Sequence, residues 1–443
     1  MKALLINPCW NGRVSKKGKR FNRAWPPLSL LNCASLLEEE GFEVKLIDAR
    51  AEGIEIDEIA DTAKYSDMVF ITSSPIDRWQ CPNLEFDLFI KMVNSIPSED
   101  LFIMGVHGTI YPEQLLLKTG AKAIISGEPE PTVVELAEKK DLSKIKGITY
   151  KINDKIITNP DRQPIDLSTL PVPAYHLLNK DKYYYELLGK NLALFEGSRG
   201  CPHNCSFCLK VMYGNGIRYK PVENLLNEIE VAVERQGFKH GYFIDLEFTL
   251  NKERIKLLCK GLTEKNYDFY WCCQTRPDTV DEELLKEMKG AGCRLIHYGV
   301  ETGSEKVMKN IKKKVTLKQV EKAVLSTQKT GMEAACFFLF GLPGEKKEDM
   351  LKTIAFAKGI NPAYASFHIA TPYPGTEFYM QNGNEELFPE FLQEEHQYET
   401  LSKMTRKAYL KFYVRPGYIF SRIKDSSPKA LIRQAALFRE FAA

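Results

Sequence analysis

Three cysteines near the middle of the chain have the spacing of an iron–sulfur ligand set. Cys201, Cys205 and Cys208 form a CxxxCxxC pattern. Three thiolates on one short loop can hold three irons of a cubane cluster, because cysteine is the usual cluster ligand. The fourth iron is then left without a protein ligand, and an open metal position of this kind is typical of a reactive centre.

A structural zinc site is the alternative for this loop. Structural zinc takes four ligands, commonly as two pairs whose members are about two to four residues apart. No second pair follows at such a distance. Cys272 and Cys273 are adjacent, so on an extended strand their side chains would point to opposite faces. The pattern therefore favours a cluster.

The composition is ordinary for a globular protein. Of the 443 residues, 44% are hydrophobic and 27% are charged, and the formal net charge is +3, which leaves no electrostatic footprint for nucleic acid. No apolar stretch approaches the roughly 20 residues that cross a bilayer, and the first apolar run is too short for a signal peptide. With 11 cysteines and no secretion signal, we expect a cytoplasmic protein that carries thiols and a cluster.

The first third of the chain predicts an open α/β domain that could position a ligand. Short apolar strands alternate with helical patterns, which is typical of a parallel, doubly wound (Rossmann-like) sheet. The expected strands are 3–7, 44–48, 69–72, 101–105 and 123–126, with helices at 28–40 and 84–93. Ligands of such sheets bind beyond the carboxyl ends of the strands.

Polar residues and glycines stand at these strand ends. They are Asp48, Ser73, Ser74, Gly105, His107, Gly108, Gly127 and Glu128. The glycines allow close approach of a ligand to the backbone. No GxGxxG follows the first strand, which argues against a nicotinamide or flavin dinucleotide. Taken alone, the domain could also serve only for packing.

In order and spacing, these motifs resemble the cobalamin-binding domain of cobalamin-dependent radical S-adenosylmethionine enzymes. The segments that carry the resemblance are 26–31, Asp48, 105–107 and 127–128. It implies that cobalamin lies between this domain and the rest of the chain, with Gly105, Gly108 and Gly127 against its nucleotide tail.

The loop after the first strand lacks the DxHxxG motif of other cobalamin proteins, so no histidine is expected to coordinate the cobalt from there. His107 could pack on the corrin or its tail, or simply bond to the backbone. The loop after the third strand is long. We predict that Arg78 or Trp79 covers the lower face of the cobalt without coordinating it, and anchoring of Trp79 in the core is the alternative.

Residues 147–173 predict a hairpin and an extended, proline-containing linker. A second α/β run begins near residue 192. Its strands end in the segments 195–200, 244–247, 271–276, 297–303, 338–344 and 368–372. Six strand–helix units predict a partial (β/α)6 barrel whose strand ends supply the active site, and the cysteine loop follows the first of these strands.

Over residues 191 to about 380, the cysteine loop and the strand ends resemble the radical S-adenosylmethionine superfamily. The resemblance implies that the three cysteines bind a [4Fe–4S] cluster whose open iron takes the amino and carboxylate groups of S-adenosyl-L-methionine. It also implies further contacts to that molecule. These are Phe207, Phe340 and Gly341 near the adenine, Glu247 at the methionine amino group, and Glu301, Thr302 and Ser304 at the ribose and carboxylate.

Each of these residues has a plainer alternative. Glu247 and Glu301 could be surface carboxylates, and Phe207 and Phe340 could be core residues. Arg276 is a candidate clamp for a carboxylate or phosphate, and a structural ion pair is its rival.

The expected organisation is a cobalamin-binding domain (1–145), a hairpin and linker (146–190), a radical domain (191–380) and a helical C-terminal region (381–443). The C-terminal region either caps the barrel mouth or only packs. The resemblance implies a C-methyltransferase that uses a 5′-deoxyadenosyl radical and methylcobalamin to methylate an unactivated carbon. Its expected partners are a flavodoxin- or ferredoxin-type electron donor and a small-molecule, lipid or protein substrate, without nucleic acid.

Three other functions remain as alternatives. A related enzyme could perform cyclisation or rearrangement without net methyl transfer. The first domain could be a cobalamin-sensing or structural module, although the position of the cysteine loop at the barrel rim argues against this. A methylthiotransferase would need a second cluster, for which only Cys9, Cys33 and Cys81 are available in the first domain, and Cys33 falls in a predicted helix.

Overall fold

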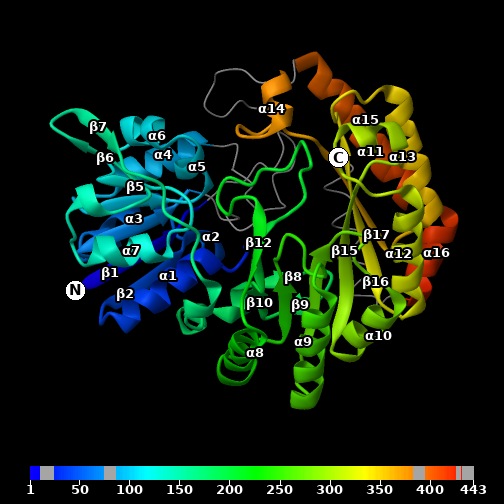
Figure 1. Cartoon of the computed structure of the whole chain (residues 1–443), viewed down its shortest axis with the longest axis horizontal. Helices are drawn as coiled ribbons and strands as arrows, with labels where there is room; N and C mark the ends of the chain where they lie inside the picture. Colours follow the sequence, from blue (N-terminus) through cyan, green and yellow to red (C-terminus); the bar gives the residue numbers. More distant parts are fainter. Residues whose placement is uncertain (10–23, 74–85, 383–394, 426–430, 432–443) are drawn as a thin grey trace.

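Two sheets, each flanked by helices, form two lobes that lie side by side in the computed structural model (Figure 1). The structure describes residues 1–9, 24–73, 86–382, 395–425 and 431. The first lobe contains the N-terminus, and the second contains the cysteine loop.

The first sheet has the strand order β2–β1–β3–β4–β5–β6–β7. Its first five strands are parallel: β1 (Lys2–Asn7), β2 (Glu43–Asp48), β3 (Met68–Thr72), β4 (Leu101–Met104) and β5 (Ala123–Ile125). The predicted doubly wound sheet is confirmed. The strand order reverses between β1 and β3, which is where open sheets of this type bind their ligands.

Alternate residues of the first sheet pack against helices on opposite faces. Ala3 and Leu5 of β1 share a core with α1 (Leu28–Glu39) and α7 (Glu130–Ala137). Leu4 and Ile6 face α3 (Ile56–Ala63), α4 (Phe86–Ser95) and α6 (Pro112–Lys118). This alternation is the two-residue period of a strand buried on both sides. Two short helices, α2 (Ala49–Glu52) and α5 (Val106–Ile110), follow β2 and β4.

The hairpin that the sequence predicts after residue 147 belongs to the first sheet. Its strands are β6 (Ile148–Ile152) and β7 (Lys155–Thr158), and β6 pairs antiparallel with β5. The hairpin therefore extends the edge of this sheet, and the linker begins after it.

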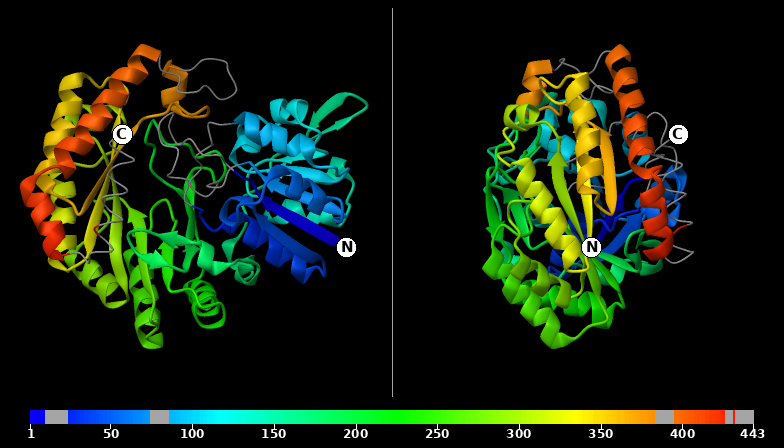
Figure 2. Two further views of the ribbon diagram at one scale, coloured as in Figure 1. Left: turned by 180° about the vertical axis from the view of Figure 1, so that it is seen from behind. Right: turned by 90° about the vertical axis from the view of Figure 1, so that its right-hand side faces the viewer.

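The second sheet is a six-stranded parallel arc in which the strands follow chain order. They are β10 (Leu192–Phe195), β13 (His240–Phe243), β14 (Tyr270–Thr275), β15 (Cys293–Glu301), β16 (Glu333–Phe340) and β17 (Tyr364–Ile369). The described strands β10 and β17 each pair on one side only, so the arc is open and the predicted partial barrel is confirmed (Figure 2).

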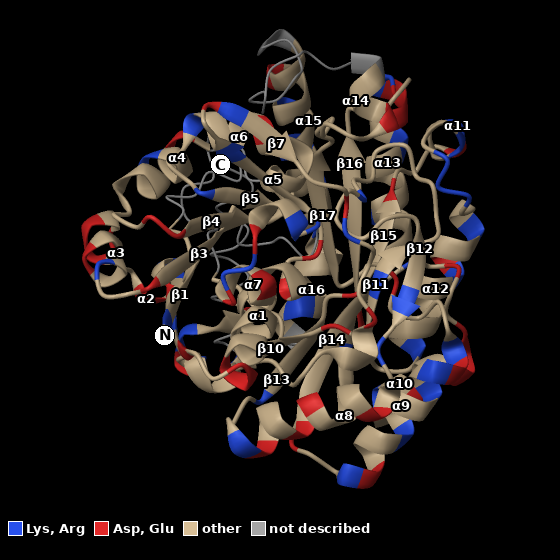
Figure 3. Cartoon of the chain, turned by 60° about the vertical axis from the view of Figure 1, so that its left-hand side comes forward, with Lys and Arg blue, Asp and Glu red and all other residues tan. Residues whose placement is uncertain are grey.

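Helices cover the outside of this arc. They are α8 (Val222–Glu230), which continues as a π-helical turn (Val231–Arg235), α9 (Lys252–Lys265), α10 (Glu282–Gly290), α11 (Glu305–Asn310), α12 (Leu317–Lys329) and α13 (Lys347–Ile360). Acidic and basic side chains are interspersed over both lobes (Figure 3), as the nearly balanced net charge predicts.

Two small hairpins complete the second lobe. One consists of β8 (Tyr184–Tyr185) and β9 (Gly189–Lys190). The other pairs β11 (Ser198–Cys201) with β12 (Gly216–Tyr219) and carries the cysteine loop between its strands. We call this second hairpin, residues 198–219, the cluster hairpin.

The C-terminal region is helical where it is described, in α14 (Glu377–Asn382), α15 (Glu395–Tyr413) and α16 (Pro416–Asp425). Tyr413 and Tyr409 of α15 accept hydrogen bonds from the backbone N–H groups of Ala365 and Phe367 in β17, each at 3.0 Å. This helix therefore protects the edge of the open arc. None of the described helices is both long and apolar enough to cross a bilayer.

Candidate functional site

The three cysteines lie on the rim of the arc, where the cluster hairpin turns. Cys201 ends β11, and the backbone N–H of Cys208 donates to the carbonyl of Cys205 at 3.2 Å. All three side chains are half-buried thiols outside any disulfide. Burial raises the pKa of the Cys201 and Cys205 thiols.

Gly200 and Lys210 give the loop its shape. Gly200 has a φ of +86°, and a Cβ atom there would lie 2.3 Å from the carbonyl oxygen of Gly216 on the facing strand. The Lys210 ammonium donates to the carbonyls of His203 (2.8 Å) and Cys201 (3.4 Å). One cation thus gathers the carbonyls of the loop, a role that the sequence analysis did not assign to it.

Backbone hydrogen bonds and apolar packing attach the cysteine loop to neighbouring segments of the second lobe. The Ser206 N–H donates to the Ile311 carbonyl at 3.1 Å, and the Phe378 N–H donates to the Ser206 carbonyl at 2.9 Å. Phe207 packs into the apolar cluster that contains Val307, Ile311 and Phe378. The ring therefore anchors the loop in the barrel.

Among the described residues, no three His, Cys, Asp or Glu side chains converge on a single metal-sized point. A cubane cluster places one thiolate on each of three separate irons, so it does not require the sulfurs to converge in this way. The donor set of three thiols on one tightly held loop fits such a cluster.

Glu247 has one occupied and one unoccupied carboxylate oxygen. Its Oε1 accepts hydrogen bonds from the Thr275 hydroxyl (2.5 Å), the Arg276 N–H (3.1 Å) and the Thr279 hydroxyl (3.1 Å). Its Oε2 is buried without a hydrogen-bond partner. Burial raises the pKa of this carboxyl group, and a positively charged group beside the Oε2 would offset that effect.

Arg276 lies beside Glu247 and is arranged in the complementary way. Its Nε and Nη2 donate to Asp278 at 2.9 and 2.8 Å, while its Nη1 is buried without a partner. The Arg276 Nε is 4.0 Å from the Glu247 Oε2. Because buried polar atoms are normally paired, these two atoms fit the ammonium and carboxylate of a bound amino acid.

Glu301 ends β15 in a left-handed conformation, with a φ of +70°, that is costly for a residue other than glycine. Its Oε1 accepts a hydrogen bond from the buried Lys313 ammonium at 2.7 Å. Burial lowers the pKa of Lys313, but Glu301 and Cys205 outweigh this effect and the net shift is upward. Lys313 thus places a buried positive charge near the cysteine loop, and only the fold reveals it.

Thr302 and Ser304 face the helices instead of the rim. The Thr302 hydroxyl bonds to the Thr353 hydroxyl at 3.1 Å, and the Ser304 hydroxyl donates to Asp349 at 2.8 Å. Both partners belong to α13. These bonds join the turn after β15 to α13.

The Phe340 ring is part of the core. It is fully buried and stacks on Phe367 at 5.9 Å, and Phe367 packs against Tyr409 of α15. The ring therefore lies on the outer face of β16, which is the core position that the sequence left open as its alternative. The next residue, Gly341, donates its N–H to the Glu345 carboxylate at 2.6 Å.

Aromatic side chains line the inner face of the arc. Tyr242 and Phe337 stack on opposite sides of His297, each at 5.3 Å, and the His297 Nε2 lies 3.1 Å from the Tyr185 hydroxyl. Trp25, from the first lobe, packs on Tyr185 at 5.6 Å. The neighbouring Tyr298 instead bonds to Thr327 of α12 on the outer face, so His297 faces inward. No motif in the sequence pointed to this aromatic surface.

In the first lobe, Asp48 and His107 have structural partners. Asp48 caps α2 through a bond from the Ala51 N–H (3.0 Å) and accepts from the Tyr183 hydroxyl at 2.7 Å. His107 is fully buried, stacks on Phe86 at 4.7 Å and lies 3.2 Å from the Ser73 hydroxyl. His107 thus contacts the hydroxyl of a neighbouring strand end.

The three glycines of this lobe differ in their surroundings. A Cβ atom on Gly108 would meet the Ile124 side chain at 2.7 Å and the Ile125 carbonyl at 3.1 Å, so glycine is required there for α5 to pack on β5. Gly127 has a φ of +74° and open space beside it, and Gly105 starts α5 with a φ of +104°.

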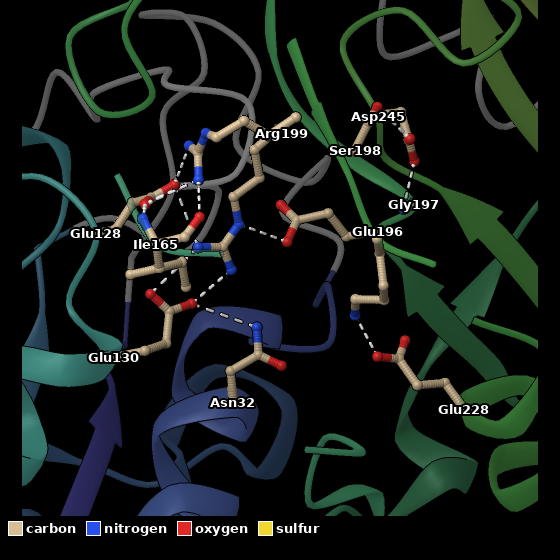
Figure 4. Close-up of polar contacts among 12 residues, drawn as sticks. Asn32, Glu128, Glu130, Ile165, Glu196, Gly197, Ser198, Arg199, Glu228 and Asp245 are labelled. Carbon is tan, nitrogen blue, oxygen red and sulfur yellow. Dashed lines mark hydrogen bonds and ion pairs between the residues drawn. The ribbon is translucent and has the colours of Figure 1, made fainter. Parts of the chain in front are cut away.

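The Glu128 carboxylate forms ion pairs with arginines of the other lobe. It forms an ion pair with Arg218 at 2.5 Å and lies 3.4 Å from Arg199 (Figure 4). It also accepts a hydrogen bond from the Ile165 N–H at 2.7 Å. Glu128 thus connects the first lobe to the cluster hairpin and to the linker.

Four positions from the sequence analysis lie outside the described residues. They are Ser74, Arg78, Trp79 and Cys81. Cys33, one of the cysteines considered for a second cluster, lies fully buried in α1.

Comparison with known proteins agrees with this arrangement. The radical SAM superfamily matches residues 195–357. An uncharacterized methyltransferase of Pyrococcus horikoshii is 32% identical over 96% of this chain and 94% of its own length. An anaerobic magnesium-protoporphyrin IX monomethyl ester cyclase of Rubrivivax gelatinosus is 27% identical over 87% of this chain and 70% of its own.

Two solved structures share the fold of both lobes. The cobalamin-dependent S-adenosylmethionine radical enzyme OxsB, with aqua-cobalamin and S-adenosylmethionine bound, superposes with a TM-score of 0.75 at 17% identity over 99% of this chain and 71% of its own. The radical S-adenosylmethionine methyltransferase TsrM of Kitasatospora setae, with cobalamin and a [4Fe–4S] cluster bound, gives a TM-score of 0.69 at 17% identity over 86% and 74%. The chain therefore belongs to the same family as the P. horikoshii methyltransferase, and its residues 195–357 match the radical SAM superfamily.

Proposed function

We propose that this protein is a methyltransferase that adds a methyl group to an unactivated carbon. When bound, the cluster and S-adenosylmethionine supply a 5′-deoxyadenosyl radical, and cobalamin supplies the methyl group. The observation that carries the proposal is the pairing of a three-cysteine loop with the two unsatisfied buried atoms of Glu247 and Arg276. The P. horikoshii relative is named as a methyltransferase and is similar over nearly the full chain, which supports the proposal further.

The residues of the rim have separate tasks. Cys201, Cys205 and Cys208 hold the cluster, and Lys210 keeps their loop closed. The Glu247 Oε2 accepts from the ammonium of S-adenosylmethionine, while the Arg276 Nη1 donates to its carboxylate. Both contacts replace water with fixed partners, so they orient the molecule as well as bind it.

The first lobe is proposed to bind cobalamin over the carboxyl ends of its strands. The open space beside Gly127 and the switch point between β1 and β3 support this position. Residues 1–145 with the β6–β7 hairpin would form this domain, followed by the linker to 190, the radical domain at 191–380 and the helical region at 381–443.

An electron donor is part of the proposal, because the cluster must be reduced. The segment 305–322 carries six exposed lysines, namely Lys306, Lys309, Lys312, Lys314, Lys318 and Lys322, against two exposed glutamates. Its Ile311 carbonyl bonds to Ser206 inside the cysteine loop. A basic surface this close to the cluster suits an acidic carrier of the flavodoxin or ferredoxin type.

Product analysis tests the proposed function. Anaerobically reconstituted protein, given S-adenosylmethionine, reductant and cobalamin, is expected to form both 5′-deoxyadenosine and S-adenosylhomocysteine with its substrate. Replacing Cys201, Cys205 and Cys208 together by alanine should abolish the cluster and 5′-deoxyadenosine formation. A brown chromophore that survives this change would contradict the assignment.

A cyclase or rearrangement enzyme is the second candidate. The similarity to the R. gelatinosus cyclase over 87% of the chain favours it. Such an enzyme would form 5′-deoxyadenosine during substrate conversion without S-adenosylhomocysteine. That product pattern would replace methyl transfer as the function.

A further inference from the structure

The cluster hairpin carries two arginines that both reach the first lobe. Arg199 of β11 and Arg218 of β12 are direct cross-strand partners. Their side chains are 0% and 27% exposed. Both lie against Glu128, which follows β5 of the first sheet (Figure 4). The hairpin that holds the cysteines is therefore bound to the other lobe from both of its strands.

Arg199 lies at the centre of this contact. Its Nη2 donates to the Glu130 Oε1 at 2.5 Å, and its Nε donates to the Glu196 Oε2 at 2.8 Å. Burial lowers the pKa of the Arg199 guanidinium, but Glu130, Glu196 and Glu128 outweigh this effect and hold it well above the usual value. Arg199 therefore stays charged inside the protein.

Glu130 ties this charge to the frame of the first lobe. It is the first residue of α7 and is fully buried. Asn32 of α1 donates to its Oε1 at 3.4 Å. Two helices that pack on the first sheet thus hold the carboxylate that receives Arg199.

Arg218 fixes the other side of Glu128. Its Nη2 lies 2.5 Å from the Glu128 Oε1, and its Nη1 donates to the Ile165 carbonyl at 2.6 Å. The Ile165 N–H donates to the Glu128 Oε2 at 2.7 Å. The linker is therefore included in the same contact.

An apolar contact lies beside these ion pairs. Leu209, Met212 and Tyr213, which follow the last cysteine, form a buried cluster with Val106 of α5. The Arg199 guanidinium lies 5.7 Å from the centre of the Tyr213 ring. The segment leaving the cysteine loop thus packs directly on the helix that follows β4.

We propose that Arg199, Arg218, Glu128 and Glu130 are positioning residues that fix the cysteine loop relative to the strand ends of the first sheet. They set the distance and orientation between the cluster and cobalamin. This inference rests on the proposed binding of cobalamin by the first lobe. Buried ion pairs are often no more stabilising than apolar packing, whereas directional charge pairs can select one arrangement of two bodies.

The distance between the two cofactors tests the proposal directly. Pulsed dipolar electron paramagnetic resonance between the reduced cluster and cob(II)alamin should give a narrow distribution in the wild-type protein. We expect the Arg218→Met variant to bind normal amounts of iron and cobalamin and to give a clearly broadened distribution. Arg218→Lys, which keeps a positive charge, should restore part of the narrow distribution.

A matched control separates position from general stability. The Lys220–Glu228 ion pair is even more deeply buried than Arg218–Glu128 and begins two residues beyond Arg218, but it lies wholly within the second lobe. Glu228→Gln should therefore leave the distance distribution narrow. If Arg218→Met comes out unfolded, Glu128→Gln breaks the same contact with a smaller change in shape and is measured instead.

A second readout uses the products. A small misplacement of reacting groups can cost about 100-fold in rate. We therefore expect the ratio of 5′-deoxyadenosine to S-adenosylhomocysteine to rise at least about 10-fold in Arg218→Met, because S-adenosylmethionine cleavage needs only the second lobe. The ratio should stay at the wild-type value in Glu228→Gln.

Each outcome decides the matter. Equal distance distributions in the wild-type protein and Arg218→Met, or equal broadening in Glu228→Gln, would overturn the positioning role and leave the proposed function intact. A wild-type protein that binds a cluster but no cobalamin would overturn the proposed function, and the positioning role with it.

Discussion

At the scale of single residues, Gly200 controls the start of the cysteine loop. The residue lies next to Cys201 at a φ of +86°, and the facing Gly216 carbonyl occupies the space that a side chain would need. Both effects act on the backbone, so flexible side chains cannot relieve them. The ligand set thus depends on a residue that binds nothing itself.

We expect Gly200→Ala to lose most of its cluster. The methyl group would push β11 away from β12 and displace Cys201, so iron content after anaerobic reconstitution should fall well below that of the wild-type protein. Gly290→Ala is the control, because no atom lies within 4 Å of the Cβ position at that helix end. A normal iron content in Gly200→Ala would contradict this prediction, because it would mean that the cluster hairpin accommodates the methyl group without displacing Cys201.

Glu247 is expected to control S-adenosylmethionine binding in a pH-dependent way. Glu247→Gln removes the charge that receives the ammonium, and a charge-assisted bond of about 1.5–3 kcal/mol corresponds to a roughly 10- to 150-fold weaker Kd. Burial raises the pKa of Glu247, so wild-type affinity should fall as acidification protonates the carboxylate. The glutamine variant should lack this dependence on pH. Calorimetry on the reconstituted protein measures both.

At the scale of elements, the turn between β16 and α13 contains a carboxylate with an unusual pKa. Glu345 accepts from the N–H groups of Gly341 and Leu342, and burial raises its pKa from 4.5 to about 7. Because the folded state holds this proton more tightly than the unfolded state, the contribution to stability is present below about pH 4.5 and is lost as pH rises through about 7.

The expected result is a loss of stability across that range, on the order of 3 kcal/mol from this group at pH 8. Urea unfolding of the protein without cofactors, between pH 5 and 8, measures it. Glu345→Gln cannot ionise, so its stability should change less with pH. Parallel pH profiles for the two proteins would refute this reading of the turn.

The basic segment at 305–322 is the element on which electron delivery should depend. We expect the double change Lys309→Glu and Lys314→Glu to slow cluster reduction by a flavodoxin about 10-fold or more at low ionic strength, because it reverses the local field. Reduction by a small chemical reductant should be unchanged. Added salt should reduce the difference in reduction rate between the variant and the wild-type protein, because it screens the charges.

The control for this experiment reverses the charge of two exposed lysines in the first lobe, by replacing Lys45 and Lys64 with glutamate. Stopped-flow bleaching of the cluster absorbance follows each reaction. Equal slowing in the control would show that only the net charge matters, and the segment would lose its assigned role.

At the scale of the whole molecule, the buried ion pairs of Arg199 join the two lobes into one unit. Removing one partner of a buried pair typically costs about 3–5 kcal/mol, because the remaining charges stay buried. We expect Arg199→Met to lower the free energy of unfolding by an amount of this order and to separate one calorimetric transition into two. Two transitions already present in the wild-type protein would contradict this coupling.

The sequence alone determined the elements and the ligand types. Strands and helices follow from local periodicity, which is why both parallel sheets were predicted. The cysteine loop could be recognised because its three ligands lie within eight residues. Glu247 was selected through the family resemblance and Arg276 by its residue type, and both follow neighbouring parallel strands, whose carboxyl ends lie at one edge.

Only the tertiary structure decided what each remaining side chain faces. Glu128 meets Arg218 from 90 positions away, Thr302 bonds to Thr353 of α13, and the Phe340 ring stacks on Phe367 of β17. Gly108 serves the packing of α5 on β5. A residue type states which bonds a side chain can make, but its partner depends on which elements cross beside it. That choice is made when the lobes assemble and leaves no local pattern in the chain.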